Sequence, residues 1–142
     1  MFTCQNTCQP LFKKISMPKF SKASAAKLAT CHPNLQKIFN DIILTRDCTI
    51  ICGVRTLEEQ KKVFAEGFSK LDGVKKKSKH QISKEQPLAL AVDVLPYPID
   101  WNDRKGHEDF ARAVKATAEH LGIKIIWGGD WKMRDNPHYE LT

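Results

Sequence analysis

Long hydrophobic runs are missing from this sequence of 142 residues. No run approaches the roughly 18–20 apolar residues that span a bilayer, so no transmembrane segment is expected. The first twenty residues also lack an apolar stretch of about 7–15 residues, and a standard secretory signal is therefore not expected. Internal repeats and low-complexity segments are absent. The apolar share of 42% and the charged share of 27% exclude a collagen-like chain, argue against general disorder and favour a single globular domain.

The five cysteines are too few and too irregular for a disulfide framework: Cys4, Cys8, Cys31, Cys48 and Cys52. Their odd number favours folding in a reducing compartment. Cys4 and Cys8 are candidate metal ligands, but no second pair follows at zinc-finger spacing. Cys48 and Cys52 lie in CTIIC, which reads as a strand. Residues four apart on one strand share a face about 13 Å apart, so we expect neither a mutual disulfide nor one shared metal.

Acidic residues are in the minority, with 16 against 23 basic ones, and the formal net charge is +7. Lysines 75–77 form the longest basic run. A net positive charge favours a polyanionic partner, either nucleic acid or an anionic cell envelope, although a solvated lysine-rich surface explains it equally. Regularly spaced arginines and an aromatic-rich RNA-binding signature are both missing. Charge alone therefore leaves the partner open.

Apolar periodicity predicts three helices and four short strands in mixed order. We expect residues 1–16 to be an N-terminal extension without a clear pattern, and residues 17–142 to form the folded domain. The expected helices span about 33–44, 56–67 and 110–121, and the expected strands span 48–53, 88–95, 123–127 and 138–141. Short strands that need not be parallel favour an α+β domain, with a small, mainly antiparallel sheet and flanking helices, over a doubly wound fold.

One carboxylate interrupts the most apolar segment of the chain, LALAVDVLP, where Asp93 is the only charge. A buried carboxylate needs a cation, a metal or several hydrogen-bond donors, unless it faces solvent or pairs with a lysine. His80 and His138 stand in separate polar segments. Two imidazoles and one carboxylate form a known catalytic zinc set that leaves a fourth position for water. Spacing alone does not separate these two histidines from the other three, His32, His107 and His120.

The amino-acid sequences of six short segments indicate a protein family more specifically than the spacing of the candidate ligands does. These segments are GVRT at 53–56 with Gln60, SKL at 69–71, SKH at 78–80, AVD at 91–93, WGGDW at 127–131, and DNPHYE at 135–140. In this order they resemble the zinc peptidases that include D-alanyl-D-alanine carboxypeptidases and the L-alanyl-D-glutamate peptidases of bacteriophage endolysins. The resemblance runs from about residue 17 to the end of the chain.

The resemblance implies a role for five residues. His80, Asp93 and His138 would bind Zn²⁺, and Asp135, three residues before the last histidine, would be the catalytic base. Arg55 would bind and polarise the substrate. Such a site would lower the pKa of a metal-bound water and polarise the scissile carbonyl, while Asp135 moves the proton from water to the leaving amine.

Twelve residues separate His80 from Asp93, and none of them is glycine. The family usually has a shorter gap that contains a glycine, so we expect the extra residues to bulge outward, which costs little free energy. Glu140 alternates onto the face of His138 and is a candidate to support that ligand. We expect Asp130 to shape the Gly128-Gly129 turn or to support a ligand, but not to bind zinc.

The resulting hypothesis is a zinc-dependent peptidoglycan peptidase that cleaves the stem peptide at the L-alanyl-D-glutamate bond, as a phage-type endolysin does. A D-alanyl-D-alanine carboxypeptidase or dipeptidase is the alternative enzyme, and a catalytically silent wall-binding module is the alternative without activity. We expect a monomer, made in the host cytoplasm and acting at the cell wall, where basic charge favours the anionic envelope. A nucleic-acid partner is not expected, because it gives no reason for the six segments to occur together.

Overall fold

The computed structural model describes residues 18–142, and the predicted extension 1–16 lies outside this range. Residues 18–142 form four α-helices, four strands and one 3₁₀ turn. Counted over these residues only, the elements are, in chain order, α2 (Lys22–Ala29), α3 (Pro33–Ile42), β1 (Cys48–Cys52), α4 (Leu57–Ala65), β2 (Ala91–Pro96), α5 (Arg104–His120), β3 (Ile125–Trp127), η1 (Gly128–Asp130) and β4 (His138–Leu141).

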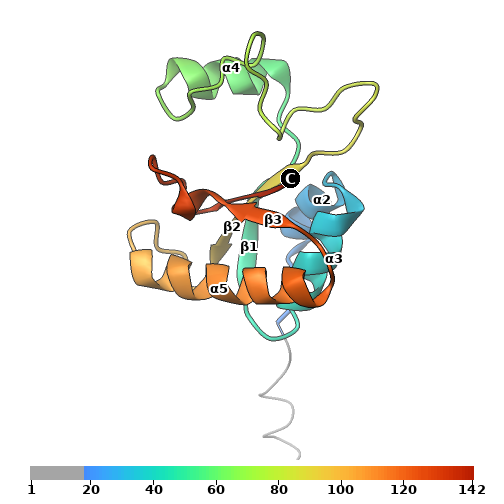
Figure 1. Cartoon of the computed structure of the whole chain (residues 1–142), viewed down its shortest axis with the longest axis vertical. Helices are drawn as coiled ribbons and strands as arrows, with labels where there is room; N and C mark the ends of the chain where they lie inside the picture. Colours follow the sequence, from blue (N-terminus) through green and yellow to red (C-terminus); the bar gives the residue numbers. More distant parts are fainter. Residues whose placement is uncertain (1–17) are drawn as a thin grey trace, which may run out of the picture.

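The four strands form one antiparallel sheet in the order β1-β2-β4-β3. Helices α3 and α5 lie on one side of this sheet, and α4 with its neighbouring loops lies on the other (Figure 1). The hydrophobic core fills the side of α3 and α5, where Tyr139 of β4 makes edge-on contacts with Phe39 of α3 and Phe110 of α5. The predicted α+β class with a small antiparallel sheet is confirmed.

Local sequence signals explain most of the helix boundaries. The Thr56 side chain accepts from the Glu59 backbone N–H and the Glu59 side chain accepts from the Thr56 N–H, which is the capping box that predicted the start of α4. Pro33 occupies the first turn of α3. Helix α2, capped by the hydroxyl of Ser21, was not predicted. Among residues 18–142, no helix is both long enough and apolar enough to cross a bilayer.

Strand alternation separates the core from the polar side of the sheet. In β4, Tyr139 and Leu141 belong to the core, so His138 and Glu140 face the opposite side. In β2, Val92 and Val94 belong to the core, and the residue between them, Asp93, faces the same side as His138. One face of the sheet therefore packs against the hydrophobic core, and the other face presents ionisable groups toward α4.

A β-bulge in β1 corrects the prediction that Cys48 and Cys52 share a face. The register pairs Ile50 with Val94 but Cys52 with Asp93, so β1 contains one extra residue between these pairs. A bulge re-aims the side chains beyond it. Cys48 therefore belongs to the core, whereas Cys52 lies on the polar face beside Asp93. Both thiols are free.

Candidate metal centre

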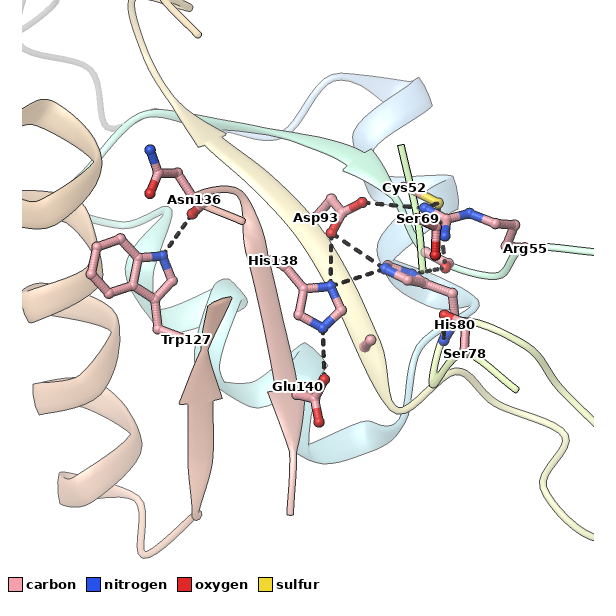
Figure 2. Close-up of polar contacts among 12 residues, drawn as sticks. Cys52, Arg55, Ser69, Ser78, His80, Asp93, Trp127, Asn136, His138 and Glu140 are labelled. Atoms are coloured by element: carbon pink, nitrogen blue, oxygen red, sulfur yellow. Dashed lines mark hydrogen bonds and ion pairs between the residues drawn. The ribbon is translucent and has the colours of Figure 1, made fainter. Parts of the chain in front are cut away.

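Four potential ligands meet on the polar face of the sheet. Cys52 of β1, Asp93 of β2 and His138 of β4 are directly paired across three adjacent strands. Side chains paired in this way have Cβ atoms about 4.5–5.5 Å apart and therefore interact. His80 joins the row from the loop between α4 and β2, as Figure 2 shows. Strand register and one loop thus bring together residues that lie far apart in the sequence.

Three atoms of this group form an almost equilateral triangle. His80 Nε2 lies 3.3 Å from Asp93 Oδ1 and 3.3 Å from His138 Nδ1. His138 Nδ1 lies 3.2 Å from Asp93 Oδ1, which completes the triangle. His80 is 1% exposed and His138 is 7% exposed. Three electronegative atoms that converge in a buried space need a shared cation, either a proton or a metal.

The backbone of Gly53 fixes the ring of His80. His80 Nδ1 donates a hydrogen bond to the Gly53 carbonyl at 2.8 Å, so the neutral ring carries its proton there and Nε2 presents a lone pair to the triangle. Gly53 has no room for a side chain, because a Cβ atom would collide with the Lys27 carbonyl and the Thr30 hydroxyl. The glycine after β1 therefore allows the close packing that holds this carbonyl against His80.

A carboxylate fixes the ring of His138 in the complementary way. His138 Nε2 donates to Glu140 Oε1 at 2.8 Å, which leaves Nδ1 as the atom that faces Asp93. Glu140 in turn pairs with Lys79 through Nζ and Oε2, 2.9 Å apart. Hydrogen bonds of this kind to the second ring nitrogen are typical of histidines that bind metals.

Cys52 supplies a fourth potential donor. Its Sγ lies within 4.8 Å of the ligand atoms of His80 and Asp93, and these three residues form a group that could hold a metal ion. The Cys52 thiol also accepts from Arg55 Nη2 at 3.8 Å. A sulfur ligand binds zinc at a longer distance than nitrogen or oxygen, about 2.3 Å. The centre therefore offers two overlapping ligand sets, one completed by His138 and one by Cys52.

The ionisable groups of the centre perturb one another strongly. Burial alone would lower the pKa of His80, but hydrogen bonding to Asp93 and Cys52 raises this pKa to about 10. Burial would likewise lower the pKa of His138, yet hydrogen bonds to Asp93 and Glu140 raise it. Burial would raise the pKa of Asp93, but the two histidines, when their rings are protonated, donate to its carboxylate and hold its pKa well below the ordinary range. The raised pKa values of the two histidines and the lowered pKa of Asp93 all describe a pocket that favours positive charge beside Asp93.

Arg55 borders the centre on the side of β1. Its Nη2 lies 3.5 Å from Asp93 Oδ2, and its Nη1 donates to Gln60 Oε1 at 2.8 Å. Gln60 is fully buried and donates in turn to the Ser69 hydroxyl and the Leu71 carbonyl. Within residues 18–142, three contacts engage a guanidinium that has five N–H donors, so donors remain for a bound molecule.

Asp135 lies in the turn that precedes β4. Its backbone N–H donates to the Gly128 carbonyl at 2.9 Å, and its own carbonyl accepts from the His138 N–H at 3.2 Å. The residue as a whole is exposed, but surrounding atoms desolvate its carboxyl group and raise its pKa, and the charge of Asp93 raises this pKa further. Asp135 is therefore close enough to sense the charges of the centre.

Comparisons with known proteins show the family of this chain. The family model described as phage L-alanyl-D-glutamate peptidase matches residues 16–142. The chain belongs to the phage L-alanyl-D-glutamate peptidase family. The L-alanyl-D-glutamate peptidase of Escherichia phage T5 is 34% identical over 128 residues, which cover 87% of this chain and 88% of that protein. The crystal structure of the Serratia marcescens L-Ala D-Glu endopeptidase ChiX superposes with a TM-score of 0.73 and 27% identity, over 90% of this chain and 92% of that one.

Membership in this family makes the chain a peptidase that acts on peptidoglycan. In this peptidase the predicted ligands His80, Asp93 and His138 lie together, and Arg55 lies beside them. The long gap between the first two ligands does not separate them, because most of residues 81–90 form an irregular loop outside the sheet. The strand expected at 88–95 begins only at Ala91 for the same reason.

The tryptophans of the WGGDW segment, Asp130 and the remaining histidines contribute no atom to the triangle. Trp131 packs against the ring of His138, with centroids 5.0 Å apart, whereas Trp127 is buried and donates to the Asn136 carbonyl. Asp130 pairs with Lys115 on the surface. The remaining histidines have separate places in the fold: His32 caps α3, His107 is buried with Nε2 beside the Asp100 carbonyl, and His120 is exposed at the end of α5.

Sequence reasoning missed two contributors to the peptidase's centre. Cys52 was assessed only as a partner of Cys48, and the bulge that turns it toward Asp93 leaves no clear sequence signal. Lys79 was considered as a member of the SKH segment and received no role, although it reaches β4 and pairs with Glu140. Its position directly before His80 was the available signal.

Proposed function

We propose that this chain is a zinc-dependent endopeptidase that cleaves the L-alanyl-D-glutamate bond of the peptidoglycan stem peptide. His80 Nε2, Asp93 Oδ1 and His138 Nδ1 would hold the metal. The observation that carries this proposal is the triangle with edges of 3.2–3.3 Å. Zinc bonds of about 2.0–2.1 Å to nitrogen and oxygen in a tetrahedral site place neighbouring ligand atoms about 3.3–3.4 Å apart.

The chemistry of the donors also fits zinc. Both imidazoles direct their protonated nitrogens outward, to the Gly53 carbonyl and to Glu140, and their other nitrogens inward. Imidazole nitrogen and carboxylate oxygen are ordinary zinc ligands, and three such ligands leave a fourth position open for water or substrate. When bound, zinc would acidify a water molecule and polarise the scissile carbonyl.

Asp135 would supply the proton transfer. A general base at this position accepts a proton from the attacking water at a carboxylate oxygen and returns it to the amine of the departing D-glutamyl residue. Desolvation and the charge of Asp93 raise the pKa of Asp135 toward neutral pH. A higher pKa makes the carboxylate a stronger base for accepting the proton of the attacking water. The turn held by Gly128 keeps this carboxylate next to β4.

Arg55 would orient the substrate. Its guanidinium is held by Gln60 on one side and faces Asp93 on the other, so its remaining donors have a fixed direction. A fixed guanidinium suits a carboxylate, which accepts two parallel hydrogen bonds, or a developing oxyanion, whose negative charge it stabilises. The stem peptide offers both groups near the bond to be cleaved.

Cys52 defines the competing arrangement, in which it replaces His138 as the third ligand of the metal. Metal analysis of Cys52→Ala and His138→Ala separates the two arrangements. We expect Cys52→Ala to retain stoichiometric zinc and His138→Ala to lose it, with circular dichroism confirming that both chains are folded. Loss of zinc confined to Cys52→Ala would assign the metal to the cysteine set.

The bond specificity has its own test. Purified peptidoglycan is digested, and the fragments are analysed by mass spectrometry with His138→Ala as the inactive control. We expect new amino-terminal glutamate and no released D-alanine. Free D-alanine without new amino-terminal glutamate would assign the alternative carboxypeptidase activity, and binding without cleavage would assign a silent wall-binding module.

We further propose that the chain acts as a monomer at the bacterial cell wall after synthesis in the host cytoplasm. The net charge of +7 favours attraction to the anionic envelope, an attraction that weakens as salt rises. Sedimentation with cell walls over a salt series tests this attraction, and a DNA gel-shift over the same series tests the expectation that nucleic acid is not a partner.

A further inference from the structure

An ion pair connects the loop that carries His80 with β4, the strand that carries His138. Lys79, directly before His80, donates through Nζ to Glu140 Oε2 at 2.9 Å and to the Leu141 carbonyl at 2.6 Å. Glu140 Oε1 accepts from His138 Nε2 at 2.8 Å. The side chain of Glu140 is 14% exposed, so this carboxylate is largely shielded from water. The contacts form a continuous chain from Lys79 through Glu140 to His138.

We propose that Glu140, held in place by Lys79, is a positioning residue that fixes the ring of His138 for metal binding. This inference rests on the proposed function, because it takes His138 as a metal ligand. Glu140 does not face the metal triangle itself; it acts on the far nitrogen of the ring. Its effect is to keep Nε2 protonated and Nδ1 directed at Asp93.

The argument follows from the hydrogen-bonding capacity of the two groups. A neutral imidazole has one N–H, and an ionised carboxylate can only accept. A carboxylate 2.8 Å from Nε2 therefore requires the proton on Nε2 and leaves the lone pair on Nδ1. Such a partner also raises the basicity of the ligand nitrogen. Without Glu140 the ring can rotate and its proton can move between the two nitrogens. Metal binding would then require one orientation and one tautomer to be selected from several.

No other contact of the ring among residues 18–142 makes this selection. Trp131 packs against the His138 ring at a centroid distance of 5.0 Å, with the planes inclined by 43°. A contact with the ring surface limits the tilt of the imidazole but does not distinguish Nδ1 from Nε2. Asp93 faces Nδ1 and would accept a proton there, which is the arrangement that metal binding has to avoid. Glu140 opposes that arrangement from the other side of the ring.

Lys79 extends the same effect to the loop of His80. Its backbone carbonyl accepts from the Leu90 N–H at 2.9 Å, while its side chain reaches β4. The segment before the first ligand is therefore tied both to the start of β2 and to the strand of the last ligand. Side chains that are held before the metal arrives lose less conformational entropy when it binds, which favours tight binding.

The test compares zinc affinity in the full-length chain by competition with a chromophoric chelator. Glu140→Ala should bind zinc about 10–100-fold more weakly than the unmodified chain, the usual effect of removing a supporting partner of a ligand. Glu140→Gln keeps an oxygen that can accept from Nε2 and should lose less. Lys79→Met, which leaves the bond between Glu140 and His138 intact, should also lose less. Glu119→Gln removes an exposed carboxylate from α5 and is the matched control with unchanged affinity.

A second readout reports on the ring directly. In the zinc-loaded chain, the Nε2–H resonance of His138 should be visible and protected from exchange with water, and in Glu140→Ala it should be lost. Circular dichroism checks the fold, and Glu140→Gln keeps the test decisive if Glu140→Ala is unfolded. Unchanged affinity together with an unchanged His138 resonance in both Glu140 variants would overturn the positioning role and leave the proposed function standing. Absence of zinc from the unmodified chain, or its retention in His138→Ala, would instead overturn the proposed ligand set.

Discussion

Asp135→Asn separates the proposed proton transfer from metal binding. The backbone of Asp135 makes two of the contacts that hold its turn, one to the Gly128 carbonyl and one from the His138 N–H, and the substitution leaves both intact. The side chain keeps its size but loses its charge and its ability to accept the proton. Loss of a general base costs about 10²–10⁴-fold in rate, or roughly 3–5 kcal/mol of activation free energy. We expect this loss with unchanged zinc content and melting temperature.

The pH dependence gives a second signature of the same residue. The base must be ionised, so activity should rise with pH through the pKa of Asp135 and fall as this group becomes protonated. Desolvation and the charge of Asp93 raise this pKa, so the acid limb of kcat/KM should lie above about 3.9, the ordinary value for aspartate. The residual activity of Asp135→Asn should lack the part of the acid limb that this carboxylate causes.

The assay measures kcat/KM on a stem-peptide substrate, zinc content and melting temperature for Asp135→Asn and Asp130→Asn in parallel. Asp130 is the matched control, because its carboxylate pairs with Lys115 on the surface. Near-normal turnover in Asp135→Asn, or loss of its zinc, would refute the assignment of Asp135 as the base. A loss confined to Asp130→Asn would move that role to Asp130.

Three further predictions concern the surrounding structure. Gly128→Ala should lower the free energy of unfolding by about 1–3 kcal/mol and reduce activity, because its Cβ would collide with the carbonyl of Asp135; thermal unfolding and turnover measure both effects. Burial raises the pKa of the Cys31 and Cys48 thiols to about 12, so at pH 8 alkylation should spare both until the chain unfolds; peptide mass spectrometry would contradict this by finding them modified in the folded chain. A chain that begins at Met17 should keep its zinc and its cooperative unfolding, and loss of either would show that residues 1–16 contribute to the domain.

Strand alternation explains why much of the fold could be predicted from the sequence. Tyr139 and Leu141 alternate with His138 and Glu140 along β4. The first pair lies in the core, and the second pair lies on the polar face of the sheet. The capping box at Thr56 similarly marked the start of α4. These signals are local, and they need no knowledge of the rest of the chain.

The contacts that complete the centre depend on tertiary structure and could not be predicted in the same way. Cys52 reaches Asp93 only because a bulge adds a residue to β1, and the bulge is visible only in the pairing with β2. The pairing of Lys79 with Glu140 depends on the loop of His80 lying over β4. The ligands themselves were proposed from the amino-acid sequences of the motifs, because spacing did not distinguish His80 from the other histidines.

X-ray absorption at the zinc edge tests the central claim most directly, because it reports the atoms bound to the metal. We expect only nitrogen and oxygen neighbours at about 2.0–2.1 Å, with imidazole scattering from two histidines, in the unmodified chain. The spectrum of Cys52→Ala should be the same. A sulfur neighbour at about 2.3 Å that disappears in Cys52→Ala would contradict the assignment of His80, Asp93 and His138 as the complete set of protein ligands.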